Sequence, residues 1–374
     1  MSSQPESERS PGLKVATIGS VPVYIGRSWG ILAVIILVLL GPQLQEANPD
    51  LGFRAYLIAA AYALMLLVAV FVHEGAHALG ARSFGYPVHR VVADLWGGHT
   101  ALDVSRATPG PSAVVAVVGP LSNLVLAALG QGVAALLEPG IPHGLASIFA
   151  LLNFLLALFN LLPGLPLDGG QLVEALVWKV TGNRHRGRVV AGYAGLVVTL
   201  GVLFWFVGRP LLAGEKPSFG SIGWSLLICM FLWQGAQNAI RSGKVAGIIA
   251  GVRVVDLLQP VVPVPAGASL ADLPSGLPPV VVDTSGMPIG LVDADALAAV
   301  PGAAIGQTPV LSVTRPMPQD WVVDVDPNGP ITPVLAPLSR QPAGLVAIRW
   351  DGRVLGVVSV AAVNAAASAR APRP

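Results

Sequence analysis

Two histidines and a glutamate lie inside a long apolar run, in the segment His73-Glu74-Gly75-Ala76-His77. If that run is a helix, the two histidines are four positions apart on one face, so their imidazoles can hold a single metal ion. Glu74 is rotated by about 100° from His73, which places it to take a proton from a water at the metal. The pattern therefore predicts a zinc centre with a general base; the alternative is a pair of packing histidines partnered by Glu74.

The composition places this run in a membrane. Of the 374 residues, 53% are hydrophobic and only 11% are charged, whereas soluble domains carry roughly 25% charged residues. No basic run indicates nucleic-acid binding, and the single cysteine, Cys229, excludes both an internal disulfide framework and a cysteine-based zinc site. Six apolar runs are predicted spans, near the roughly 20 residues that cross a bilayer except for the first, which is the shortest: 29–40, 55–81, 111–137, 145–162, 189–212 and 222–240.

The stretches between these runs are polar. Residues 1–12 are rich in Pro and Ser, which predicts a disordered tail, and residues 14–27 alternate weakly, which predicts a short extended pair. Residues 41–54 are expected to form a polar connection. Residues 83–108 are too polar to span, and their Gly97-Gly98 pair predicts strands with a turn beside the metal site.

Lys and Arg are concentrated in alternate loops, and this asymmetry predicts the orientation in the membrane. Residues 82–106 and 179–188 hold most of the basic residues between spans, whereas the opposite loops hold only Arg54, Arg209 and Lys216. Both termini are therefore expected in the cytosol, in a multi-pass protein of the cell membrane. The catalytic helix then ends near Ala81, and His73 lies roughly 12 Å inside the bilayer from the cytosolic side.

A third zinc ligand is expected from the segment 160–170, Asn-Leu-Leu-Pro-Gly-Leu-Pro-Leu-Asp-Gly-Gly. Its prolines break the fourth span and its glycines allow close backbone approach. The fourth span runs inward, so Asp168 arrives on the same side of the membrane as His73. Asp168 is a natural ligand for that site; the alternative is a helix-ending turn with a solvated carboxylate.

These two motifs together resemble the site-two protease family of intramembrane metallopeptidases, over roughly residues 14–245. The resemblance implies that His73, His77 and Asp168 bind one Zn²⁺ and that Glu74 is the base. It also implies that Asn160 holds the scissile carbonyl or its oxyanion. Gly119-Pro120-Leu121-Ser122-Asn123 resembles a further family element, so Asn123 either helps in the same way or makes a helix–helix hydrogen bond.

The resemblance implies a zinc metalloendopeptidase that cleaves membrane-spanning segments in regulated intramembrane proteolysis, with anti-sigma factors as one class of substrate. A substrate helix must unwind before its carbonyl can be attacked, and an extended substrate could pair with the edge of the 88–104 strands. The alternative is a metal-binding membrane transporter or sensor with a regulatory C-terminal domain. An intact Glu74 favours the protease, because a structural zinc site needs no base.

Beyond residue 245 the composition changes to Pro and Val without a further span. The patterns of residues 280–300 and 345–366 both predict a strand, a turn, a second strand and a short helix. This repeat resembles a tandem pair of CBS modules in a cytosolic α/β domain over 246–374; the alternative is a generic α/β domain. Nucleotide-binding modules carry a hydroxyl and then an Asp after the second strand. Ser359 is present, but Asp293 replaces the other hydroxyl and Ala296 and Ala362 replace the acids, so a homodimer contact or substrate gating is the expected role.

The sequence therefore predicts a polytopic α-helical membrane domain over residues 13–245, with about six spans and a small membrane-associated β segment. The α/β domain follows it.

Overall fold

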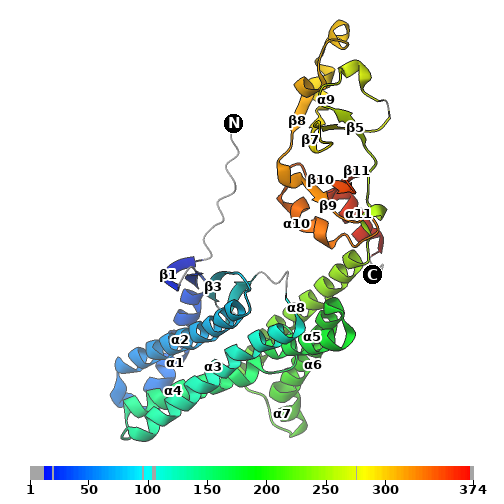
Figure 1. Ribbon diagram of the computed structural model, residues 1–374. Helices are drawn as coiled ribbons and strands as arrows, with labels where there is room; N and C mark the ends of the chain where they lie inside the picture. The colour runs from blue at the N-terminus through cyan, green and yellow to red at the C-terminus, as the bar shows by residue number, and fades with distance from the viewer. Residues whose placement is uncertain (1–11, 19–20, 95–96, 103–106, 275, 371–374) are drawn as a thin grey trace. The chain divides into compact units, whose positions relative to one another are not determined.

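The computed structural model describes residues 12–18, 21–94, 97–102, 107–274 and 276–370. The chain separates into two compact units, Met1–Gly243 and Lys244–Pro374, coloured blue to green and green to red in Figure 1. Each unit has its own packed elements. The predicted tail, residues 1–12, lies outside the described residues except for Gly12, which already belongs to a strand.

The first unit is a helical bundle with a small sheet against it (Figure 1). Helix α2 packs against α1 and α3, α3 packs against α4 and α5, and α5 packs against α6. The helices are α1 (Trp29–Ala47), α2 (Arg54–Ser83), α3 (Pro109–Leu136), α4 (Ile141–Asn160), α5 (Asp168–Thr181), α6 (Arg184–Leu203), α7 (Arg209–Leu212) and α8 (Phe219–Ala250).

Many apolar side chains of this bundle point outward, as expected for helices that face lipid. Among the described residues, five helical segments are long and apolar enough to cross a membrane: Trp29–Ala47, Arg54–Ser83, Pro109–Leu136, Ile141–Asn160 and Arg184–Leu212. The predicted sixth span, residues 222–240, lies inside α8 and is not one of these five.

The sheet has the strand order β1-β2-β3-β4, with β1 (Gly12–Ile18), β2 (Val21–Gly26), β3 (Val88–Asp94) and β4 (Gly97–Leu102). Strands β2 and β3 run parallel, and β4 is antiparallel to β3. Both strand predictions, before the first span and after the second, are therefore confirmed. Strand β4 forms one edge of the sheet, and its backbone on that side is not paired with any described strand.

Two boundaries differ from the sequence prediction. Helix α1 continues past Leu40 through Pro42 to Ala47, so residues 41–47 are not part of a polar connection. A proline removes one helical hydrogen bond, but a membrane helix tolerates that loss. Helix α5 is an unpredicted element: the chain resumes a helix at Asp168, directly after the Pro-rich break, and Gly169 and Gly170 lie in its first turn.

The second unit contains two similar strand–turn–strand–helix repeats, as predicted. Its sheets have the orders β5-β6-β7-β8 and β11-β10-β9. The elements are β5 (Val262–Pro265), β6 (Pro279–Val282), β7 (Pro288–Val292), α9 (Ala294–Ala298), β8 (Thr314–Pro316), β9 (Val322–Asp324), α10 (Thr332–Arg340), β10 (Leu345–Trp350), β11 (Arg353–Ser359) and α11 (Val360–Arg370).

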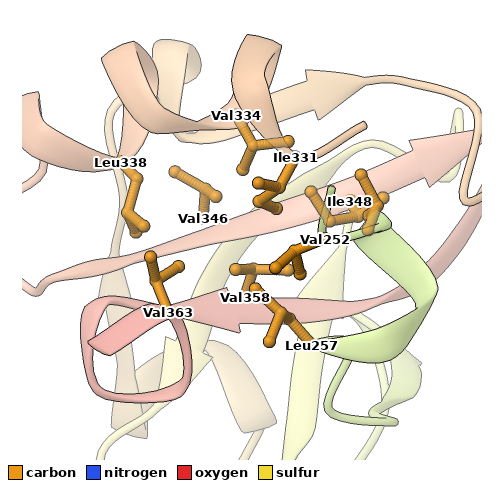
Figure 2. Packing of buried hydrophobic residues seen from close by; sticks show 10 residues of the cluster. Val252, Leu257, Ile331, Val334, Leu338, Val346, Ile348, Val358 and Val363 are labelled. Atoms are coloured by element: carbon orange, nitrogen blue, oxygen red, sulfur yellow. The ribbon is translucent and has the colours of Figure 1, made fainter. Parts of the chain in front are cut away.

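The core of the second repeat is aliphatic (Figure 2). Ile331, Val334, Val346, Ile348 and Val358 are fully buried in it. Figure 2 shows these side chains meeting between α10 and strands β10 and β11. The alternation of Val346, Ile348 and Val358 toward one face follows from the period of two in a strand. The predicted fold class, a helical membrane unit followed by an α/β unit, is confirmed.

Candidate metal centre and active site

Helix α2 presents different residues to its two neighbours. Ala78 packs with Val21, Val23 and Val91 of the sheet, and Phe71 flanks the same cluster. Glu74, one turn before Ala78, also faces the sheet, where Gly98 of β4 lies against its side chain. His73 and His77 lie on a neighbouring face, where α3 and α5 approach. One helix thus directs the ligand pair toward the bundle and the glutamate toward the sheet.

Three ligand atoms converge at this site. The Nε2 atoms of His73 and His77 are 3.1 Å apart. Asp168 Oδ2 lies 3.0 Å from His73 Nε2 and 3.3 Å from His77 Nε2. All three side chains are more than nine-tenths buried. This is the group of three that the sequence predicted, brought together across more than ninety residues of chain.

The separations fit a zinc ion. Nitrogen and oxygen ligands bind zinc at about 2.0–2.2 Å in a tetrahedral arrangement, which puts ligand atoms about 3.3 Å from one another. The three observed separations of 3.0–3.3 Å match this spacing. Two neutral imidazoles and a carboxylate are also the donor set of catalytic zinc sites, which keep a fourth position for water or substrate.

Each imidazole is held by a hydrogen bond from its other nitrogen. His73 Nδ1 lies 2.5 Å from Asn123 Oδ1, and His77 Nδ1 lies 2.6 Å from the main-chain oxygen of Val115. Because these oxygens can only accept, both Nδ1 atoms carry the hydrogen and both Nε2 atoms keep a lone pair for the metal. Such bonds fix the tautomer and the ring orientation of a zinc-binding histidine.

Asn123 is itself fully buried, and both the oxygen and the nitrogen of its amide make hydrogen bonds. Its Nδ2 donates to Asn153 Oδ1 at 2.8 Å and is 3.2 Å from the main-chain oxygen of Ala69. Asn153, on α4, donates in turn to the oxygen of Phe149. Sequence reasoning missed Asn153. The available signal was an asparagine inside an apolar membrane helix, which needs a hydrogen-bond partner there.

The Pro-rich break positions Asp168. The Leu165 main-chain nitrogen donates to Ala191 of α6 at 3.1 Å, and the Gln171 side chain donates to Asp168 Oδ1 at 3.1 Å. Gly169 and Gly170 leave no room for side chains. A Cβ on Gly169 would lie 2.3 Å from the Leu162 oxygen, and a Cβ on Gly170 would lie 2.1 Å from the Leu165 nitrogen. This tight turn aims one carboxylate oxygen at the histidines.

Two glycines line the centre as well. A Cβ on Gly119 of α3 would lie 2.3 Å from His77 Nε2 and 2.9 Å from His73 Cε1. A Cβ on Gly98 of β4 would lie 2.4 Å from Glu74 Cγ. Helix α3 and strand β4 can therefore approach the reacting groups only because they lack side chains there.

Asn160 is not joined to the cluster by a hydrogen bond. It is half-buried at the last position of α4, and its side chain makes no hydrogen bond with a described residue. The side chain of His99, between Gly98 and Thr100, lies outside the described part of the chain. Asn160 lies at the end of the helix that precedes the Pro-rich break.

Comparisons with known proteins agree with these observations. The family model described as Peptidase family M50 matches residues 134–204. The chain is 28% identical over 370 residues to the "Putative zinc metalloprotease sll0528" of Synechocystis sp., covering 94% of each chain. It is 35% identical over 241 residues to the "Putative zinc metalloprotease Rip3" of Mycobacterium tuberculosis, covering 62% of this chain and 59% of the relative.

Two solved structures are similar to parts of the chain. The site-2 protease from Methanocaldococcus jannaschii aligns with a TM-score of 0.45 at 21% identity, covering 61% of this chain and 94% of that one. The CBS domain of the bacterial CNNM/CorC family Mg²⁺ transporter aligns with a TM-score of 0.28 at 16% identity, covering 39% of this chain and 96% of that one.

The match of residues 134–204 to the family model and the similarity to putative zinc metalloproteases agree with the zinc-compatible cluster in the bundle. The chain is a zinc-dependent intramembrane metalloprotease similar to peptidase family M50, and its C-terminal unit resembles CBS domains.

Proposed function

We propose that this protease cuts membrane-spanning segments of other proteins with His73, His77 and Asp168 as its zinc ligands and Glu74 as its general base. The observation that carries this assignment is the triangle of ligand atoms, 3.0–3.3 Å apart and buried, with Glu74 beside it on the next face of α2. A structural zinc site would have no use for a buried carboxylate next to its ligands.

Bound zinc would supply a Lewis acid that activates a water and polarises the scissile carbonyl. Glu74 accepts the proton of the attacking water and then delivers a proton to the leaving amine. The Asn160 amide, which hydrogen-bonds to no described residue, is proposed to donate a hydrogen bond to the carbonyl oxygen. Asn123 has both ends of its amide engaged, which supports a role in holding His73 and not in binding the substrate oxygen.

The edge of strand β4 is the proposed place for the substrate backbone. A membrane-spanning helix has its backbone groups bonded internally, so it must unwind to expose a carbonyl. The unwound segment then needs new partners, and an open strand edge provides them by strand addition. Strand β4 is an edge of its sheet and lies against the catalytic helix.

Both termini and the CBS-type unit are proposed to face the cytosol, as the distribution of Lys and Arg requires. The substrates are proposed to be membrane-anchored proteins such as anti-sigma factors, and the CBS-type unit is proposed to form a homodimer or to gate substrate entry. Light scattering of the purified full-length chain would test the homodimer: a monomeric mass would contradict it.

A Glu74→Gln variant tests the assignment of the base. It keeps the size and hydrogen-bonding capacity of the side chain but cannot accept a proton, so zinc should stay bound while cleavage of a single-span substrate in detergent micelles is lost. Glu138→Gln, a change at an exposed glutamate, is the matched control and should leave cleavage unchanged. Appreciable cleavage by Glu74→Gln would refute the role of Glu74. Membrane stubs that accumulate in cells carrying this variant would identify the substrates.

A further inference from the structure

The carboxylate of Glu74 has a partner that the zinc motif does not contain. Thr100 Oγ1 of β4 lies 2.8 Å from Glu74 Oε2, to which it donates, and 3.1 Å from the Glu74 main-chain oxygen, which is the longer of the two contacts. Among the described residues, no other side chain donates a hydrogen bond to this carboxylate. Glu74 is only 6% exposed, and a buried carboxylate depends on such bonds because few waters can replace them.

The strand that carries Thr100 encloses the Glu74 side chain at two points. Gly98 and Thr100 are two positions apart in β4 and therefore face the same side of the sheet. The bare Gly98 lies directly over the Glu74 stem, where a Cβ would come within 2.4 Å of Cγ and 2.9 Å of Oε1. Thr100 then reaches the end of the same side chain. Together they hold the stem and one oxygen of Glu74.

The pairing of β4 with β3 determines the position of β4 along the axis of α2. Thr100 pairs with Val91 of β3, and Val91 packs on Ala78, one helical turn beyond Glu74. A shift of one residue in this pairing would turn Thr100 away from the helix. The register of the sheet therefore determines that the hydroxyl meets the glutamate.

We propose that Thr100 is a positioning residue for the protease: it holds Oε2 of Glu74 so that Oε1 is oriented for proton transfer. Thr100 does not touch the substrate through this bond, and it is no ligand of the zinc. Because it belongs to the edge strand, the same element would seat the substrate backbone and orient the base. The inference rests on the proposed role of Glu74 as the base.

The test compares Thr100→Val with Thr100→Ser in the purified full-length protein, with a fluorescently labelled single-span peptide that the unaltered chain cleaves. Thr100→Val keeps the shape but removes the hydroxyl. It should lower kcat by about tenfold to hundredfold, the size expected for losing one hydrogen bond to a charged group, with KM within about twofold and bound zinc unchanged. Thr100→Ser should restore most of kcat. Thr17→Val, at an exposed threonine of β1 in the same sheet, is the control and should match the unaltered chain.

A second comparison asks whether Thr100 acts through Glu74. In a Glu74→Gln background, adding Thr100→Val should change the residual rate by less than about twofold, because residues that act as a unit are not additive. Wild-type kcat in Thr100→Val, equal impairment of the Val and Ser variants, or a loss of bound zinc would each overturn the proposal while leaving Glu74 as the base. An active Glu74→Gln variant would instead overturn both assignments.

Discussion

His73 on α2 and Asn123 on α3 are joined by a hydrogen bond of 2.5 Å between Nδ1 and Oδ1. The bond is continued by Asn153 on α4, so three membrane helices meet behind one imidazole. The sequence allowed two roles for Asn123: contact with the oxyanion or a helix–helix hydrogen bond. The structure shows helix–helix hydrogen bonds, and one of the partners is His73, the proposed zinc ligand.

We therefore predict that Asn123→Ala weakens zinc binding. Without Oδ1 the Nδ1 hydrogen of His73 is buried without an acceptor, and the ring loses its fixed orientation. The expected loss of zinc affinity is about tenfold to hundredfold, measured by competition with a chelator. Ser122→Ala, which removes a hydroxyl that bonds within α3 to the Gly119 oxygen, is the control and should bind zinc normally. An Asn123→Ala variant with unchanged affinity would show that the bond does not position the ring.

Asp168 should be indispensable for the metal. Asp168→Ala removes one of three ligands and should reduce zinc affinity by well over a hundredfold, with cleavage lost in parallel. Asp168→Asn should fall between, since an amide oxygen coordinates weakly. Zinc content after gel filtration measures both variants, with the exposed Asp50→Asn as control. Full zinc occupancy in Asp168→Ala would mean that another group completes the site.

A methyl group at position 119 should close the site. In Gly119→Ala the new Cβ would lie 2.3 Å from His77 Nε2, well inside van der Waals contact and on the metal-facing nitrogen. We expect no stoichiometric zinc and no cleavage, although all three ligands and the base remain. Gly132→Ala on the same helix, where nothing lies within 4 Å of the new Cβ, should behave like the unaltered chain. Normal zinc binding by Gly119→Ala would show that α3 can retreat from the imidazoles.

The orientation in the membrane can be tested by cysteine labelling. In a Cys229→Ser background, Lys216→Cys should react with a membrane-impermeant maleimide on intact cells. Arg186→Cys and Arg353→Cys should react only after lysis, because both are proposed to face the cytosol. All three positions are exposed in the structure. Labelling of Arg186→Cys from outside would reverse the proposed orientation and move the metal centre to the other half of the bilayer.

The CBS-type unit should not bind adenosine nucleotides. Asp293 Oδ1 accepts from the main-chain nitrogens of Asp295 and Ala296 at the start of α9, and Ser359 Oγ accepts from that of Ala362 in α11. These helix-start nitrogens are the donors that a phosphate would use, and here the chain's own side chains occupy them. Calorimetric titration of the full-length protein with MgATP should show no binding tighter than about 1 mM. Saturable binding below that concentration would contradict the prediction.

The residues of the metal centre were predictable because their chemistry constrains their spacing. Two imidazoles on one helix can bind the same metal ion when they are four positions apart, so the spacing of His73 and His77 predicts a pair of ligands. Asp168 was predictable because the distribution of Lys and Arg predicts that α2 and α4 end on the same side of the membrane. By contrast, the hydrogen bond of Thr100 depends on the register between β3 and β4, which no local pattern of residues specifies.

Helix α5 was missed for a similar reason. The sequence Pro-Leu-Asp-Gly-Gly reads as a break, because glycine disfavours helices by about 1 kcal/mol relative to alanine. Here the close approach of the Leu161 and Leu162 oxygens to Gly169 demands the absence of a side chain, and tertiary packing outweighs the local preference. The extension of α1 through Pro42 has a different reason, because a membrane helix tolerates the hydrogen bond that a proline removes.

The bare backbone of Gly119 also bears on how inactive relatives of this enzyme can arise. A proteolytically dead descendant would not need to lose a histidine, the glutamate or the aspartate. One extra carbon at Gly119 would occupy the space of the zinc ion beside His77, while the ligands and the base remained in the sequence. If Gly119→Ala loses zinc as predicted, a relative with a side chain at this position is expected to lack the metal although all of its motif residues are present.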